Sequence, residues 1–302
     1  MSDTATMPKD YQSGVGAAGA SHPVTTRLAL ETCGVKKIPT HHEAAGMRGQ
    51  LAHRSEDVAE GTYTVSGPVS LRPRPEELRV LLPLLFGGSF SVNELEPAAI
   101  TDGFPFAFDR KVKVHKYNGC KFASGSISSS AGQSLVLSGQ IEGTTADAPA
   151  AAGSFPSLDL SLQPPFMHHH AVITVDGTAR KTDDINISVN HAVQADRFFN
   201  SQTRSEIPQG DRIVTLSCKN PFTSDEYDLY TLALAGVEAS IVYTNGAYSL
   251  TVEFPCLQAA VEDPQPAGPT VEMPLMMNYT AKTVDGSAIS AQEIKFTLDD
   301  VA

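Results

Sequence analysis

Five Asn-Gly or Asp-Gly pairs constrain this chain more than any other feature, because each lies beside strand-like sequence. A two-residue hairpin turn needs positive φ at both central residues, which Asn or Asp followed by Gly adopts at little cost. The pairs are Asp102-Gly103, Asn118-Gly119, Asp176-Gly177, Asn245-Gly246 and Asp285-Gly286. Together they predict a chain built from antiparallel hairpins.

The runs around these pairs alternate apolar and polar side chains, as half-buried strands do. Examples are residues 62–66, 134–138, 171–175, 212–216 and 248–252. Two segments have a helical pattern instead: 75–86, where Pro83 should kink or shorten the helix, and 224–235. We therefore expect a mainly β fold with two short helices.

An internal repeat divides the chain. Residues 63–88 run from a strand through a short loop and an acidic helix start to a leucine-rich helix and a glycine, and 213–236 do the same. The helices lie about 148 residues apart, which predicts two related lobes, because solenoid units are ~20–50 residues long. We expect a flexible N-terminal arm at 1–24, a first lobe at 25–160 and a second at 161–302.

Charge excludes some functions. The 302 residues carry a net charge of −12, and the acid is uneven: residues 1–150 hold 14 basic and 15 acidic side chains, residues 151–302 hold 8 and 19. Such a chain is poorly suited to wrapping a nucleic-acid backbone, which requires Lys and Arg. No apolar run is long enough to span a membrane, and the N-terminus is not that of a secretory signal.

The candidate cofactor-binding and metal-binding motifs lack the sequence context that such sites need. Residues 14–19 spell G-x-G-x-x-G without the strand before and helix after that a dinucleotide site needs, so they belong to the arm. The histidines at 168–170 are adjacent, and neighbours on a strand point to opposite faces. The run His41-His42-Glu43 lacks the second His that a zinc helix would need at position 46, where Gly46 stands. A surface or subunit-contact role is favoured, with a metal site shared between chains left open. We expect no enzyme, no cofactor and no metal.

The four cysteines are widely spaced, which favours free thiols over two disulfides or a zinc site. Two long mixed loops, 87–103 and 190–210, favour functional or interfacial roles, and the second contains the apolar pair Phe198-Phe199. The basic stretch 110–116 fits an outward strand face or a partner for the acidic lobe of a neighbouring copy.

The order of these features resembles the major tail tube proteins of bacteriophages with long non-contractile tails. The resemblance is carried by residues 61–69, the helix at 75–86 with Gly87, 117–121, 126–128, 134–137, 165–166, 175–177 and 185–190. It implies an antiparallel β-sandwich or half-barrel subunit that forms stacked rings around a conduit for DNA ejection. The two-lobe repeat suggests a pseudo-hexameric trimer, with a hexamer as the alternative.

The resemblance also implies partners: further copies of the chain, the tail terminator and tail-tip proteins, the tape measure protein in the lumen, and DNA passing without adhesion. The protein would be part of the virion tail, assembled in the host cytoplasm. Our candidates for contacts between rings are the N-terminal arm and, in the two long loops and beside them, Phe90, Glu94, Phe104, Phe198, Phe199 and Arg204. Our candidates for an acidic lumen or interface are Asp183, Asp184, Glu238 and Glu253.

The alternative function is a carbohydrate- or receptor-binding β-sandwich, as in a tail-tip module or adhesin. Such a site should gather exposed aromatic side chains for stacking on sugars. The chain has no Trp and is only 7% aromatic, which favours the tube protein.

Overall fold

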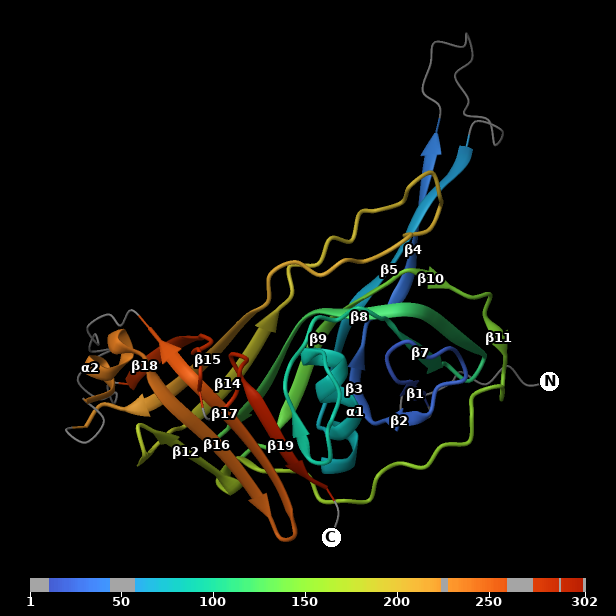
Figure 1. Cartoon of the computed structure of the whole chain (residues 1–302). Helices are drawn as coiled ribbons and strands as arrows, with labels where there is room; N and C mark the ends of the chain where they lie inside the picture. Colours follow the sequence, from blue (N-terminus) through green and yellow to red (C-terminus); the bar gives the residue numbers. More distant parts are fainter. Residues whose placement is uncertain (1–10, 44–57, 224–227, 260–273, 288, 301–302) are drawn as a thin grey trace, which may run out of the picture.

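In the part of the chain that the structure describes, the fold is an open antiparallel sheet with two α-helices (Figure 1). The computed structural model describes residues 11–43, 58–223, 228–259, 274–287 and 289–300. The sheet is large, antiparallel and not closed into a barrel. The predicted mainly β, antiparallel class with two short helices is therefore confirmed.

Helix α1 (Pro75–Phe86) lies among the strands of the first part of the chain. Those strands are β1 (Gln12–Val15), β2 (Thr26–Leu28), β3 (Leu30–Cys33), β4 (Lys36–Glu43), β5 (Val58–Leu71), β6 (Glu94–Leu95), β7 (Phe104–Asp109), β8 (Lys113–Ser130), β9 (Val136–Gly143), β10 (Thr145–Ala146) and β11 (Ala150–Ala151).

Helix α2 (Asp228–Ala235) and the short 3-10 helix η3 (His168–His170) belong to the rest of the chain. The strands there are β12 (Ala171–Val175), β13 (Thr178–Arg180), β14 (Asp184–Asn190), β15 (Ile213–Pro221), β16 (Val237–Asn245), β17 (Tyr248–Gln258), β18 (Pro274–Ala281) and β19 (Lys295–Asp299).

The order of strand pairing occurs twice. One run of hydrogen-bonded neighbours is β2-β1-β7-β8-β9-β5-β4, and the other is β13-β12-β16-β17-β18-β15-β14. In each, a hairpin, a strand pair, a helix and three further strands follow one another along the chain. The two runs therefore share one topology.

Strand β8 joins the two runs. Its first half lies between β7 and the short strands β10 and β11, and its second half lies between β9 and β14. Apolar side chains from both runs pack into one hydrophobic core. The sheet is thus continuous from β4 through β5, β9, β8, β14 and β15 to β18.

Helix α1 occupies the predicted residues and packs against strands of both runs. Its leucines are buried, and the ring of Phe86 lies 4.6 Å from that of Phe296 on β19. Pro83 does not end the helix, which continues to Phe86. Gly87 follows with a φ of 79° and donates its N–H to the carbonyl of Pro83.

The five Asx-Gly pairs do not all form hairpins, which corrects that prediction. Asp176-Gly177 and Asn245-Gly246 lie at the turns that join β12 to β13 and β16 to β17. Asn118-Gly119 instead lies inside β8, where Gly119 has a φ of 58°. Asp102-Gly103 precedes β7, and Asp285-Gly286 lies in the loop before β19.

Part of the expected N-terminal arm belongs to the sheet. Residues 12–15 form β1, which pairs with β2 and β7. The glycines that suggested a flexible arm allow close approach instead, because a Cβ on Gly14 would lie 2.9 Å from the carbonyl oxygen of Thr26. Residues 1–10 lie outside the described part of the chain.

Candidate functional site

The outward face of the sheet carries a row of hydroxyl side chains. Directly paired residues point to the same face, so the row can be followed from strand to strand. It crosses β3, β5, β9, β8, β14, β15 and β18 at Thr32, Ser70, Ser138, Ser126, Ser188, Thr215 and Thr280. Seven strands at ~4.8 Å spacing give the row a length of about 29 Å.

The rows on either side are also uncharged. One consists of Pro68, Gln140, Ser124, Asn190 and Ile213. The other consists of Val136, Ser128, Asn186, Ser217 and Asn278. Neighbouring hydroxyls bond to each other, as Ser126 Oγ and Ser138 Oγ do at 2.9 Å. We call these three rows the hydroxyl face; it exposes polar groups that water can solvate.

The opposite side of the same strands is apolar. Ile127, Ile187 and Leu216 lie between the hydroxyl-face residues along β8, β14 and β15, and each is at most 2% exposed. The sheet therefore has one face in the core and one face in solvent, the pattern that antiparallel sheets favour.

The four acidic candidates lie in different places. Asp184 begins β14 at the margin of the hydroxyl face, opposite Ser130 and Lys219, and exposed Asp183 precedes it. Glu253 lies on β17 opposite Lys295, and Glu238 is exposed near the start of β16. The structure thus brings Asp183 and Asp184 together and separates them from the other two.

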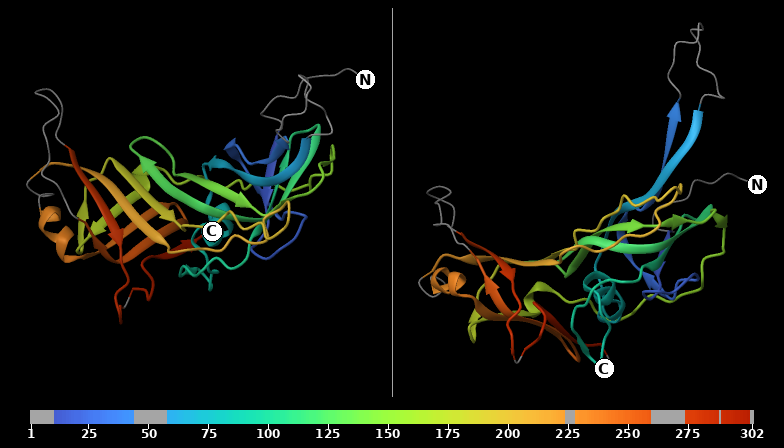
Figure 2. Two further views of the ribbon diagram at one scale, coloured as in Figure 1. Left: turned by 90° about the horizontal axis from the view of Figure 1, so that it is seen from above. Right: turned by 45° about the horizontal axis from the view of Figure 1, so that its top comes forward.

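A projecting arm extends from the body of the molecule (Figures 1 and 2). It consists of β4, the paired part of β5 and the loop 191–212, which runs beside them and is joined by a hydrogen bond from Tyr63 N–H to the carbonyl of Gln202 (2.9 Å). All eight residues of β4 are exposed. Ile38, Val58 and Phe199 expose 40%, 47% and 67% of their surface there. The arm therefore presents apolar side chains to solvent.

Buried contacts fasten the loop to the body. Arg204 is 6% exposed, and its Nη1 lies 2.6 Å from Glu142 Oε2 on β9. The same nitrogen donates to the carbonyls of Val65 and Gly143 at 3.3 Å. Arg204 was a candidate for contacts between rings, and in this chain its guanidinium lies in the interior. The apolar candidates of this loop lie outside, with Phe198 half-buried and Phe199 exposed.

A buried histidine secures the base of the loop. His191 is fully buried, donates from Nε2 to the carbonyl of Leu85 (2.6 Å) and accepts at Nδ1 from Gln209 Nε2 (2.8 Å). Gln209 Oε1 accepts the N–H of Ile100 (2.6 Å). Burial lowers the pKa of His191. One imidazole thus ties both long loops to the end of α1, a role that its sequence position did not indicate.

The candidates around 87–104 divide in the same way. Phe104 is 2% exposed, and its ring lies 5.5 Å from that of Phe122 in the core. Phe90 is half-buried under the guanidinium of Arg79 (5.1 Å). Glu94 is exposed and accepts from Lys295 Nζ (2.9 Å). Of these three, Glu94 is the most accessible to a neighbouring molecule.

Groups that could hold a metal or react are not assembled in the described residues. His168 contacts Ser129 Oγ and the carbonyl of Thr182, and His170 accepts the N–H of Met167. Nowhere in the described ranges do three or more His, Cys, Asp or Glu side chains converge on a metal position. The four cysteines are free, and burial raises the pKa of Cys218 to about 12.

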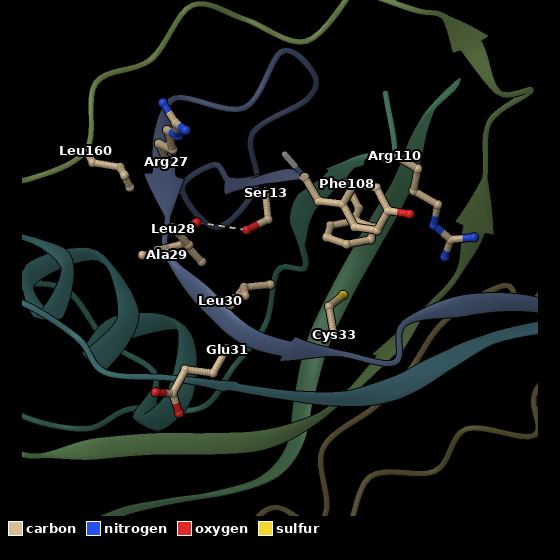
Figure 3. A pocket seen from close by; sticks show the side chains of 11 residues that line it. Ser13, Arg27, Leu28, Ala29, Leu30, Glu31, Cys33, Phe108, Arg110 and Leu160 are labelled. Carbon is tan, nitrogen blue, oxygen red and sulfur yellow. Dashed lines mark hydrogen bonds between the residues drawn. The ribbon is translucent and has the colours of Figure 1, made fainter. Parts of the chain in front are cut away.

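A pocket of about 660 Å³ lies beside β3 (Figure 3). Leu30 and Cys33 border it from β3, and Phe108 and Arg110 border it from β7 and the residue after it. No described strand pairs with the outer edge of β3 or of β4. The pocket therefore lies at an open margin of the sheet.

The comparison with known families decides what this β fold is. The profile of the phage tail tube protein family matches residues 50–297. The chain belongs to the phage tail tube protein family. No curated protein matches it. The resemblance proposed from the sequence is thus confirmed at the level of the family, as is a structural role in the tail tube.

Membership makes this protein a component of the virion tail that assembles with further copies of itself and with other tail proteins. None of the helices in the described ranges has the length and hydropathy of a transmembrane span. Nothing favours the receptor-binding alternative over the tube role.

Proposed function

We propose that this tail tube protein forms closed rings that stack into a tube, and that the hydroxyl face lines the bore through which DNA leaves the virion. The carrying observation is the hydroxyl face itself: three rows across the sheet without an Asp, Glu, Lys or Arg. Phosphates bind tightly to Lys and Arg, so a wall without cations lets DNA slide past.

Asp183 and Asp184 lie at the margin of this wall with Lys219 opposite Asp184, so these three side chains would leave one net negative charge there to repel the phosphates. Glu238 and Glu253 lie on β16 and β17 and fit an interface better than the bore. The acidic lumen hypothesis is thereby narrowed to one pair of neighbouring carboxylates.

Contacts between rings belong, in this proposal, to the projecting arm, to the loop 87–103 and to the N-terminal residues. The apolar side chains of the arm support this role, because an isolated two-stranded hairpin is at best marginally stable in water. Phe198, Phe199 and Glu94 are the candidates that a neighbouring ring could reach. Phe90, Phe104 and Arg204 would support these contacts from beneath.

The repeated pairing order supports a two-lobe subunit with lobes at 25–160 and 161–302, the first of which is extended by β1, a strand that precedes residue 25 and pairs with β2 and β7. Three such subunits would present six related lobes, so we favour a pseudo-hexameric trimer over a hexamer. Assembly would take place in the host cytoplasm, and the tube would end at the terminator and tip proteins and enclose the tape measure protein. We propose no catalytic role.

Electron microscopy of the purified chain tests the proposal. Rings or tubes with a bore of constant diameter are the expected result. Discrete monomers that bind glycans, with no rings or tubes over a range of salt and concentration, would favour the receptor-binding alternative and refute a self-assembling tube.

A further inference from the structure

A chain of hydrogen bonds that runs in one direction joins the bases of the two long loops. The N–H of Ile100 donates to Gln209 Oε1 (2.6 Å), Gln209 Nε2 donates to His191 Nδ1 (2.8 Å), and His191 Nε2 donates to the carbonyl of Leu85 (2.6 Å). We call these four residues the clasp. It connects the loop 87–103, the loop 191–212 and the last turn of α1.

The direction of this chain is fixed at both ends. A backbone N–H can only donate and a carbonyl can only accept. Ile100 therefore sets which end of the Gln209 amide faces His191, and Leu85 sets which nitrogen of the imidazole carries the proton. Gln209 cannot turn its amide to offer Oε1 to a proton on Nδ1 without setting its NH2 group against the N–H of Ile100. The clasp is satisfied only when the His191 ring is neutral.

The surroundings of His191 also favour the neutral ring. The ring is fully buried, and burial is the largest effect that lowers its pKa. From the same loop, the guanidinium of Arg212 lowers the pKa further. The hydrogen bond to the Leu85 carbonyl and the carboxylate of Glu293, in the segment before β19, raise it. Glu293 is already paired with Arg212, so a proton on the ring would have to share this carboxylate with the guanidinium.

Two cations hold the loop 87–103 to the body independently of the clasp. From β8, Lys121 Nζ donates to the carbonyls of Ile100 (3.0 Å) and Thr101 (2.9 Å). Arg212 Nη1 donates to the carbonyl of Ala98 (2.9 Å). Because these bonds involve neither His191 nor Gln209, breaking the clasp would detach the base of the loop 191–212 and leave the loop 87–103 in place.

We propose that the clasp is a proton-operated switch, in which a proton on Nδ1 of His191 detaches the base of the loop 191–212 from the loop 87–103. The protonated ring and the Gln209 amide would direct two N–H donors at each other, and the charged ring gains hydration only by leaving the interior. The switch itself does not depend on the proposed function. Its consequence for assembly does, since loosening this loop would weaken contacts between rings in acid.

The size of the effect follows from proton uptake. An open clasp exposes His191 to water, where its pKa is the ordinary 6.5. Opening then takes up a proton, so lowering the pH from 7.5 to 5.0 should increase the open fraction by up to about 30-fold. The full factor applies when the pKa of the closed clasp lies well below 5.0.

Hydrogen exchange at the Ile100 amide measures the switch, because this N–H forms one end of the clasp. Mass spectrometry of the full chain, corrected for the intrinsic effect of pH on exchange, should show its protection falling by up to about 30-fold between pH 7.5 and 5.0. The internal reference is the amide of Leu298, which donates to the carbonyl of Asn93 (2.8 Å) outside the clasp and should keep its protection.

Gln209→Glu is the decisive variant. Its carboxylate would accept from the N–H of Ile100 and also from a protonated His191, so the clasp should stay closed at pH 5.0 and the response to acid should disappear. Gln194→Glu makes the same substitution at an exposed position of the same loop and should keep the wild-type response. His191→Gln removes the titrating group and should abolish the response, whatever the protection of its Ile100 amide at pH 7.5.

An Ile100 amide with equal protection at both pH values in the wild type would overturn the inference, as would a Gln209→Glu variant that responds to acid like the wild type. Electron microscopy at the same two pH values separates the switch from the proposed function. Wild-type tubes should shorten or dissociate at pH 5.0, and Gln209→Glu tubes should persist. Tubes that keep their length while the Ile100 amide loses protection would confirm the switch and contradict the contact role proposed for the loop 191–212.

Discussion

His191 illustrates how single residues organise this fold. Its neutral ring both donates and accepts a hydrogen bond. Burial lowers its pKa; among the described residues, the hydrogen bond to the Leu85 carbonyl and the charge of Glu293 raise the pKa, and the charge of Arg212 lowers it. Between pH 6.5 and its lower folded pKa, this histidine binds a proton more readily in the unfolded chain than in the folded chain. The free energy of unfolding should therefore fall as pH decreases from 6.5 toward the lower folded pKa, and level off beneath it.

Urea unfolding of wild type and His191→Gln at pH 7.5 and 5.5 checks this prediction. The variant should lose only part of the pH dependence of the free energy of unfolding. The remainder comes from His22, His115 and His170, whose pKa values are also lowered by burial and which the substitution leaves in place. Equal pH dependence in the two proteins would contradict a neutral His191.

Arg204 carries a second residue-scale prediction. Its side chain and that of Glu142 are only 5% and 14% exposed. Arg204→Ala leaves a largely buried carboxylate whose remaining partners include Ser66 Oγ at 2.6 Å. Breaking a buried pair from one side costs about 3 kcal/mol, whereas replacing both partners costs less. Arg204→Met with Glu142→Gln should thus be more stable in chemical unfolding than Arg204→Ala; the reverse order would contradict the account.

Among the elements, the loop 191–212 makes the sharpest prediction. Phe199 has a φ of 37° and is exposed, so the isolated chain gains little from its ring. A bulky residue held at positive φ indicates a function other than stabilising the isolated chain, such as contact with another molecule. Phe199→Gly should leave the free energy of unfolding unchanged or raise it by up to ~1 kcal/mol, and should weaken tube formation.

Asn200→Gly is the matched control, since Asn200 is also exposed and has a φ of 60°. It should relieve the same backbone cost and leave assembly intact. If both variants form tubes like wild type at equal concentration, Phe199 does not contribute to contacts between rings.

The elements also show what sequence patterns could predict. Local rules found α1, because its proline start, acidic first turn and final glycine are all local signals. The same rules wrongly predicted a turn at Asn118-Gly119. The glycine is needed there because β8 passes close to Thr144: a Cβ on Gly119 would lie 2.3 Å from Thr144 Oγ1. Arg204 contacts Glu142, which is 62 positions away along the chain, and His191 contacts Leu85, which is 106 positions away. No local sequence pattern encodes contacts of this kind.

At the scale of the molecule, the net negative charge of the chain does not translate into an acidic sheet face. The net charge of −12 suggested a lumen lined by acids, but the hydroxyl face is uncharged, with Asp184 at its margin. The repeated pairing order was visible in the sequence as two strand-helix patterns. The shared junction at β8 was not, because it depends on pairing between strands far apart in the chain.

DNA passage supplies a prediction at this scale. Phage carrying Ser126→Lys with Ser188→Lys should eject DNA more slowly, because two cations per subunit would bind passing phosphates. Phage carrying Ser126→Asn with Ser188→Asn controls for changed side-chain size and should eject at the wild-type rate. Equal ejection by lysine and asparagine variants with intact tails would argue against a lumenal hydroxyl face.

The most direct measurement is an electron cryomicroscopy reconstruction of the assembled tube. Our account predicts that the row from Thr32 to Thr280 faces the bore in every subunit. A reconstruction with this row on the outer wall, or buried between stacked rings, would contradict the central claim.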